Sequence, residues 1–207
     1  MARILAQIYK DLGILKKGHL IETDRAGLVG EYVRQTAVKT NKVINSAVGG
    51  VLFIDEAYSL YSESAEDYGR EAIATLLKRM EDERDNLVVV MAGYTEEMKQ
   101  FIDLNPGLRS RFNRYIDFTD YSPGELFQIF KRYIDKGDFK LTSDAKAAFL
   151  RLFEDAFANR DRTFGNARFV RNIFEKTIER QSLRVADIQN PNVEQLTTIT
   201  EVDVPKL

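Results

Sequence analysis

Two adjacent carboxylates, Asp55 and Glu56, follow an unbroken apolar run at residues 51–54. Four large apolar residues in a row predict a strand that is buried on both faces of a parallel sheet. Ligands of open α/β sheets bind at the carboxyl ends of the strands, so this acidic pair stands where a site would form. Because neighbouring strand positions point to opposite sides, the two carboxylates could take different roles. The alternative is a buried strand that simply meets a polar loop.

The elements around this pair must hold it in place. Strand patterns are expected at residues 20–23, 51–54, 87–93 and 115–118. Amphipathic helix patterns separate the first three of them, and this βαβ alternation predicts a parallel sheet flanked by helices. The chain opens on helical spacing from Ile4 to Leu15 with no capping residue before it, as expected for a chain that begins inside a helix.

The second half of the chain predicts helices alone. Ser122 as N-cap, Pro123 in the first helical position and Glu125 three residues after the cap form a strong start signal. No strand pattern interrupts the apolar helix faces that follow. We therefore expect an α/β subdomain at residues 1–120, a helical lobe at 121–186 and a tail at 187–207.

Composition sets further limits. A formal net charge of -2 with 30% charged residues gives no basic excess, so nothing electrostatic supports a nucleic-acid or anionic-membrane partner. The absence of Cys and the single His19 leave no thiolate or histidine-cluster metal site. No apolar run approaches the length of a membrane span and no signal peptide is evident, so we expect a cytoplasmic protein.

Six short motifs follow one another along the chain. They are LVGEY (28–32), GGVLFIDEAY (49–58), DYG (67–69), AGY (92–94), NPGLRSRF (105–112) and GNAR (165–168). In this order they resemble the AAA+ ATPases, and more narrowly the CbbX and SpoVK group, which includes red-type rubisco activase. Type VII secretion ATPases carry similar modules. The resemblance covers nearly the whole chain and implies a P-loop NTPase-type parallel sheet with flanking helices and a C-terminal helical lid.

The resemblance also implies roles for individual residues. Asp55, in the Walker B position, would help to hold Mg²⁺, and Glu56 would polarise the water that attacks the γ-phosphate. Arg111, with Arg109 as the second candidate, would be the arginine finger that reaches the nucleotide of the neighbouring subunit, where its planar fork can bind two phosphate oxygens. A surface Arg paired with a nearby Asp is the alternative for this position.

Three more residues receive roles from the same resemblance. Arg168 would be the lid sensor that touches the phosphates of its own subunit; a helix-capping or solvent Arg is the alternative, and Arg171 lies close by. Tyr32 would be the pore-loop aromatic that grips a polypeptide, or else a surface aromatic. Tyr94 stands near the position where Asn or Thr commonly senses the γ-phosphate, so it is a nucleotide-site candidate whose role is open.

The phosphate-binding P-loop, Gly-x-x-x-x-Gly-Lys-Ser/Thr, has no match in the sequence. The first helix resembles the one that follows this loop in the family, so we expect the first strand and the P-loop to be absent. An inner sheet edge left open in this way is costly. We expect the chain alone to bind ATP poorly, whereas its full-length parent would use ATP and Mg²⁺.

The function that these motifs favour is a Mg-ATP-dependent remodelling motor. It would form a homo-oligomeric ring, a hexamer by resemblance, and pull on a polypeptide substrate. The alternative is a catalytically silent AAA+-like interaction module, which the missing P-loop favours. A clamp-loader-like or DNA-remodelling ATPase is a third class, weakened by the near-neutral charge and by Tyr32.

Overall fold

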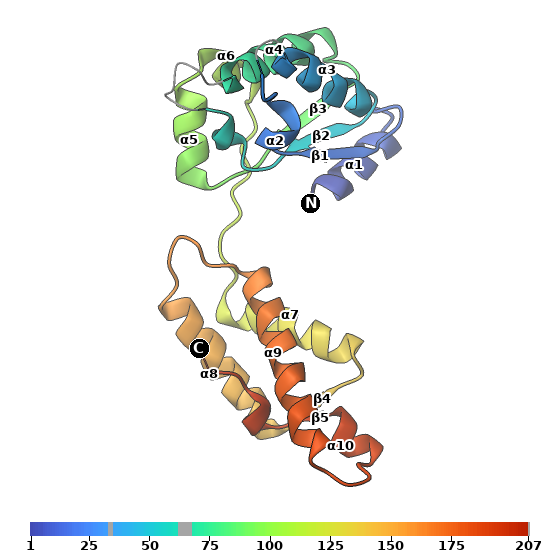
Figure 1. Ribbon diagram of the computed structural model, residues 1–207, viewed down its shortest axis with the longest axis vertical. Helices are drawn as coiled ribbons and strands as arrows, with labels where there is room; N and C mark the ends of the chain where they lie inside the picture. Colours follow the sequence, from blue (N-terminus) through green and yellow to red (C-terminus); the bar gives the residue numbers. More distant parts are fainter. Residues whose placement is uncertain (33–34, 62–67, 207) are drawn as a thin grey trace. The chain divides into compact units, whose positions relative to one another are not determined.

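A computed structural model describes residues 1–32, 35–61 and 68–206 (Figure 1). The chain divides into two compact units, Met1–Asp117 and Phe118–Leu207, each with its own apolar core. Two residues named from the sequence lie outside the described residues: Val33, in the helix pattern expected before the strand at 51–54, and Asp67 of the DYG motif. No described helix has the length and apolar character that crossing a membrane would require.

The first unit is built on a three-stranded parallel sheet with the order β1-β2-β3. The strands are β1 (Leu20–Thr23), β2 (Val51–Ile54) and β3 (Val88–Met91). The central strand β2 pairs in parallel with both neighbours, so that Ile54 lies opposite Thr23 on one side and Met91 on the other. The carboxyl ends of all three strands therefore meet at one edge of the sheet.

Helices cover this sheet on both faces (Figure 1). They are α1 (Ala2–Asp11), α2 (Arg25–Leu28), α3 (Gln35–Ala47), the 3₁₀ helix η1 (Ala57–Leu60), α4 (Gly69–Asp82), α5 (Thr95–Asp103) and α6 (Pro106–Arg111). Leu52 and Ile54 of β2 belong to the main core with residues of α3 and α4, whereas Val51 packs with Ala6 of α1. The prediction of a strand buried on both faces is thereby confirmed.

The strand expected at residues 115–118 does not form. Residues 113–122 have no regular secondary structure, and Tyr115, Ile116 and Phe118 are 63%, 71% and 69% exposed. A strand is stable only when its backbone groups pair with a neighbour. Among the described residues no strand pairs with the outer edge of β3 or with this segment. The prediction of a strand at residues 115–118 is therefore wrong, because its residue types favour a strand but no partner strand is present.

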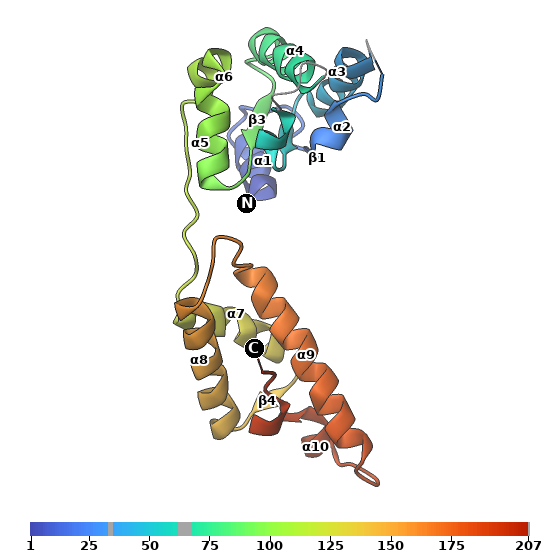
Figure 2. The same cartoon turned by 60° about the vertical axis from the view of Figure 1, so that its left-hand side comes forward.

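The second unit consists mainly of three helices that pack around phenylalanine rings. The helices are α7 (Pro123–Lys136), α8 (Ser143–Ala158) and α9 (Ala167–Ala186), and Figure 2 shows them side by side. The fully buried Phe130 of α7 lies with its ring centroid 4.2 Å from that of Phe149 and 5.8 Å from that of Phe153, both on α8. The predicted capping box of Ser122 and Glu125 is present.

The residues that we set apart as a tail pack into this second unit. They form α10 (Val193–Thr197), β5 (Thr198–Ile199) and the 3₁₀ helix η2 (Glu201–Asp203), and β5 pairs in parallel with β4 (Lys140–Leu141). Ile199 is fully buried in the phenylalanine core. The lobe is therefore not helical throughout, and a two-residue strand leaves no sequence period by which it could be predicted.

An ion pair anchors this last segment to α9. Asp203, only 1% exposed, accepts two hydrogen bonds from Arg184, at 2.8 and 2.9 Å, and further ones from the backbone N–H and the hydroxyl of Thr200. Burial alone would raise the pKa of Asp203, but the hydrogen bonds from Arg184 and Thr200 outweigh it and hold the pKa below its usual value.

We predict that Asp203→Asn lowers the free energy of unfolding of the second unit by about 2 kcal/mol, because hydrogen bonds to a charged partner are lost. Urea unfolding followed by circular dichroism measures it. Glu201→Gln is the matched control, since Glu201 pairs with Arg151 on the surface at 3.6 Å; it should change stability by less than about 0.5 kcal/mol. The Asp203→Asn effect is present above the unfolded-state pKa of about 3.9 and should fade as the pH falls through the lower folded-state pKa. An effect no larger than that of the control would contradict the anchor.

Candidate functional site

The acidic pair lies at the carboxyl edge of the sheet, as its sequence position predicts. The backbone N–H of Asp55 donates to the carbonyl of Thr23 at 2.8 Å, which extends the β1–β2 ladder by one residue, and an Asp55 carboxylate oxygen accepts from the N–H of Glu56 at 3.1 Å. Glu56 itself has left-handed backbone angles, φ 46° and ψ 46°. A non-glycine residue in this region is strained by about 1–3 kcal/mol, a cost found most often at functional sites.

The turn at Glu56, and not strand alternation, sets the directions of the two carboxylates. Glu56 lies beyond the strand, which ends at Ile54, so strand alternation does not set the directions of the two carboxylates. The left-handed turn sets them instead. Both side chains are exposed. The backbone of Asp55 is held by its hydrogen bond to β1, whereas the left-handed turn positions Glu56. The two carboxylates can therefore take different roles.

A hollow of about 510 Å³ lies beside the pair. Its lining includes Asp24, Arg25, Asp55, Glu56 and Ser59. Arg25 donates to the carbonyl of Ser59 at 2.6 Å, and Asp24 caps α2 by accepting from the N–H of Gly27. The hollow therefore presents three carboxylates and one guanidinium at the sheet edge.

Asp24 is a site residue that the sequence reasoning missed. It directly follows β1, in the same relation to that strand as Asp55 has to β2. The rule that ligands bind at the carboxyl ends of strands applies equally to both positions. The signal was therefore available in the sequence, although the strand before Asp24 is less apolar than β2.

The donor set of this edge fits Mg²⁺ that is bound together with a nucleotide. Among the residues that the structure describes, no group of three or more His, Cys, Asp or Glu could hold a metal ion. Mg²⁺ is usually bound by one or two carboxylates, with substrate phosphates and water as the other ligands. Asp55 could supply such a carboxylate, and no all-protein metal cage is required.

Tyr94 reaches the same edge from β3. The N–H of Ala57 donates to the carbonyl of Ala92 at 3.0 Å, which ties the chain after Glu56 to the end of β3. The Tyr94 ring lies 6.4 Å from that of Tyr58, centroid to centroid. Partial burial, followed by the negative charge of Glu56, raises the pKa of the Tyr58 phenol. Both rings thus belong to the surroundings of the acidic pair.

The two arginine candidates lie at the end of α6. Asn105 caps this helix by accepting from the N–H groups of Gly107 and Leu108, and the buried Leu108 fixes the helix to the core. The Arg111 side chain is 33% exposed, and its guanidinium lies 3.7 Å from a carboxylate oxygen of Glu81. Arg109 is exposed. The expected alternative for Arg111 was a surface pair with Asp, whereas the structure pairs it with Glu81; at this distance on the surface the pair is weak.

Tyr32 is exposed at the end of a segment whose backbone is hydrogen-bonded to side chains of α3. Side chains of α3 bind the backbone that leads to it: Thr36 accepts from the N–H of Gly30, and Thr40 donates to the carbonyl of Leu28, each at 3.0 Å. Lys39 donates to the carbonyls of Ala26 and Val29. Tyr32 remains 68% exposed, so an aromatic ring stands next to a backbone segment that these hydrogen bonds hold.

Arg168 lies in the second unit, at the second position of α9. Its side chain is exposed, whereas Arg171 donates to Glu175 one turn further on at 2.8 Å. The ion pair along the helix thus engages Arg171, and the role of Arg168 stays a prediction. Arg168 keeps the position that the resemblance assigns to a phosphate sensor.

A parallel sheet with an acidic pair at its carboxyl edge and a separate helical unit after it places the chain in the class of α/β ATPases with a lid. Residues 1–120 match the family "ATPase family associated with various cellular activities (AAA)", and residues 122–207 match the AAA lid domain. The chain belongs to the AAA family of ATPases, which implies nucleotide binding.

Curated relatives support the narrower resemblance. Stage V sporulation protein K of Bacillus subtilis is 45% identical over 89% of this chain and 58% of its own length. The chloroplastic ribulose bisphosphate carboxylase/oxygenase activase of Cyanidioschyzon merolae is 45% identical over 89% of this chain and 63% of its own. The ESX-3 secretion system protein EccA3 of Mycolicibacterium smegmatis is 44% identical over 100% and 36%. The chain thus spans about one third to two thirds of these relatives, and the predicted likeness to the CbbX and SpoVK group is confirmed.

A solved structure supports the fold alone. The crystal structure of the FIGL-1 AAA domain in complex with ADP superposes with a TM-score of 0.60 at 18% identity, and the match covers 88% of this chain and 59% of that one. The predicted α/β fold with flanking helices and a C-terminal lid is confirmed on this basis.

The Tyr58 ring packs beside the acidic pair because Gly93 has no side chain in its way. A Cβ at position 93 would lie 2.7 Å from the Tyr58 ring and 2.9 Å from Met98. We predict that Gly93→Ala destabilises the first unit by about 1–3 kcal/mol, the usual effect of overpacking, and displaces Tyr58. Urea unfolding and near-ultraviolet circular dichroism of the tyrosines measure the two effects. Gly124→Ala is the control, because a Cβ there meets nothing within 4 Å; equal behaviour of both variants would contradict the packing.

Proposed function

We propose that this chain is a module of a ring-forming motor that couples Mg-ATP hydrolysis to pulling on a polypeptide. The observation that carries the proposal is the Asp55–Glu56 pair at the carboxyl edge of β2, with Glu56 in a left-handed turn. The activase name of one relative, and the sporulation and secretion names of others, are compatible with protein remodelling as a shared task.

Each residue of the pair has a separate task in this proposal. Asp55, held by the backbone bond to Thr23, supplies a carboxylate to Mg²⁺, which neutralises phosphate charge when bound. Glu56 accepts a hydrogen bond from the attacking water and orients it. Tyr94 stands at the edge next to these groups through its contact with Tyr58. Its phenol is a candidate donor to the nucleotide.

Arg111 and Tyr32 extend the proposal to an assembly. Arg111 leaves its weak contact with Glu81 and neutralises phosphate charge in the site of a neighbouring copy. Tyr32, exposed at the end of its hydrogen-bonded segment, grips the substrate chain by packing that needs no particular sequence. A homo-oligomeric ring brings both residues into use, so assembly and hydrolysis depend on one another.

A silent interaction module is the second candidate, and one specific observation favours it. The sequence holds no Gly-x-x-x-x-Gly-Lys-Ser/Thr motif, whose backbone N–H groups and Lys enclose the phosphates. Hydrolysis therefore requires phosphate contacts from outside these residues. A protein that lacks them would retain only the surfaces for assembly.

ATP turnover by two proteins separates these candidates. The first is this chain, and the second is extended upstream in its natural sequence by about 40 residues, somewhat more than a βαβ unit. We predict turnover with Mg²⁺ by the longer protein alone, and a fall of at least about 100-fold in Glu56→Gln, because a neutral amide replaces the basic carboxylate that polarises the water. The control is Glu83→Gln, which removes a carboxylate that pairs with Arg79 on α4. If both lengths assemble but neither hydrolyses ATP, the silent module is the better account.

A further inference from the structure

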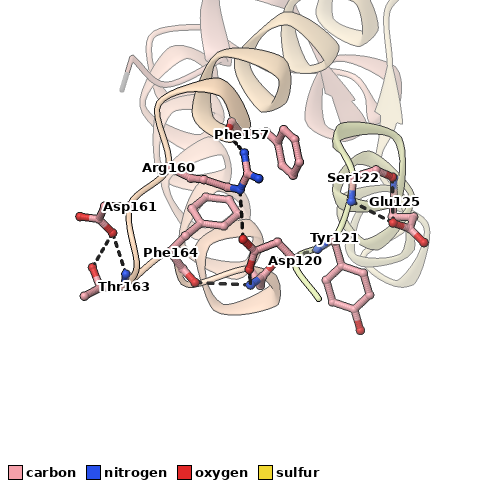
Figure 3. A network of polar contacts seen from close by, with 10 residues as sticks. Asp120, Tyr121, Ser122, Glu125, Phe157, Arg160, Asp161, Thr163 and Phe164 are labelled. Atoms are coloured by element: carbon pink, nitrogen blue, oxygen red, sulfur yellow. Dashed lines mark hydrogen bonds and ion pairs between the residues drawn. The ribbon is translucent and has the colours of Figure 1, made fainter. Parts of the chain in front are cut away.

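The turn before α9 is tied to the segment that leads into the lid (Figure 3). The side-chain amide of Asn166 donates to a carboxylate oxygen of Asp120 at 2.7 Å, and its carbonyl oxygen accepts from the backbone N–H of Tyr121 at 2.9 Å. One side chain thus binds both a side chain and the main chain of a segment 45 residues away in the sequence. We call these contacts of Asn166 with Asp120 and Tyr121 the lid clamp.

The second oxygen of Asp120 is engaged as well. Arg160 donates to it from Nε at 3.0 Å, while its guanidinium also donates to the carbonyl of Phe157 at 2.6 Å and lies 3.6 Å from the centre of the Phe157 ring (Figure 3). The hydrogen bond from Asn166, together with Arg160, holds the pKa of Asp120 below its usual value. The lid clamp and Arg160 together therefore join the end of α8, the turn before α9 and the segment that enters the lid.

The backbone of Asn166 indicates that the clamp is more than an ordinary cap. Its angles, φ 46° and ψ -117°, lie outside the regions that non-glycine residues favour, at a cost of about 1–3 kcal/mol. Asn at an N-cap normally accepts a bond from its own helix, but Asn166 makes no such bond to α9. Its side chain hydrogen-bonds to Asp120 and Tyr121 instead of to the first turn of α9.

Arg168 follows Asn166 by two residues on the first turn of α9. The clamp holds the residue two positions before Arg168, and the buried Val170 holds the residue two positions after it. Arg168 itself is exposed, so a shift of Asn166 would move the turn that carries it.

We propose that Asn166 and Asp120 are positioning residues for Arg168: through the lid clamp they hold the turn that carries Arg168 at a fixed place relative to Asp120 and Tyr121. This inference rests on the proposed ATPase function, in which Arg168 would contact nucleotide phosphates. It adds two supporting residues to that function.

The clamp itself is tested in this chain by hydrogen exchange. Asn166→Asp keeps the acceptor for Tyr121 but places two carboxylates together, so exchange of the Tyr121 N–H should quicken at least about tenfold. Combining it with Asp120→Asn exchanges donor and acceptor: the amide at position 120 donates to the carboxylate at position 166, and its carbonyl oxygen accepts from Arg160. This pair should restore slow exchange. Asp161→Asn is the control, because the hydrogen bonds that Asp161 accepts from Thr163 lie within the neighbouring loop.

The positioning role is tested by kinetics in the upstream-extended protein. We expect Asn166→Asp to lower kcat/KM for Mg-ATP about tenfold, since a misplaced group loses its contribution, and the double exchange with Asp120→Asn to restore it within about twofold. Arg168→Ala should lower it as well, and adding Asn166→Asp to Arg168→Ala should cause no further loss, because both act through one contact. A purely structural clamp would not produce this lack of additivity.

Three results would overturn the inference. Unchanged kcat/KM in Asn166→Asp would show that the clamp does not position Arg168. A full additional loss in the Arg168→Ala background would show that Asn166 acts by another route. Absence of both ATP turnover and binding in the unsubstituted extended protein would instead refute the proposed function, and the clamp, reported separately by exchange, would then be structural only.

Discussion

The candidate site depends on the burial of β2 from both sides. Val51 packs toward α1, Leu52 and Ile54 pack toward α3 and α4, and the strand is paired along both edges. A strand so enclosed cannot slip by one residue without turning its apolar side chains the wrong way. Its carboxyl end is therefore fixed, and this fixes the positions of Asp55 and Glu56, which follow it directly. The other parts of the edge, from Asp24 to Tyr94, are arranged around it.

How far the sequence predicts this arrangement depends on how local each cause is. The β2 pattern, the βαβ alternation and the capping box at Ser122 and Glu125 each arise from neighbouring residues, and all three are found in the structure. The strand at residues 115–118 has the right residue types but lacks a partner, and pairing is a property of two segments. The strand β5 (Thr198–Ile199) forms only because β4 lies beside it.

The site shows the same division. The positions of Asp55, Glu56 and Tyr94 at one edge follow from strand ends that the sequence reveals. The left-handed turn at Glu56 and the ion pair between Arg111 and Glu81 do not, because they arise from the path of the backbone and from residues 30 positions apart. The lid clamp belongs to this second kind, since Asn166 and Asp120 meet only in the folded lid.

The claim that a neighbouring copy completes the site is tested most directly by mixing two inactive variants of the upstream-extended protein. Glu56→Gln retains Arg111 but lacks the water-orienting group, and Arg111→Ala retains Glu56 but lacks the finger. If Arg111 acts across an interface, mixed assemblies contain sites with Glu56 from one copy and Arg111 from the next, and ATP turnover should reappear at about one quarter of the unsubstituted rate or less. No recovery, with mixed assembly verified, would contradict a shared site and place Arg111 within its own subunit or outside catalysis.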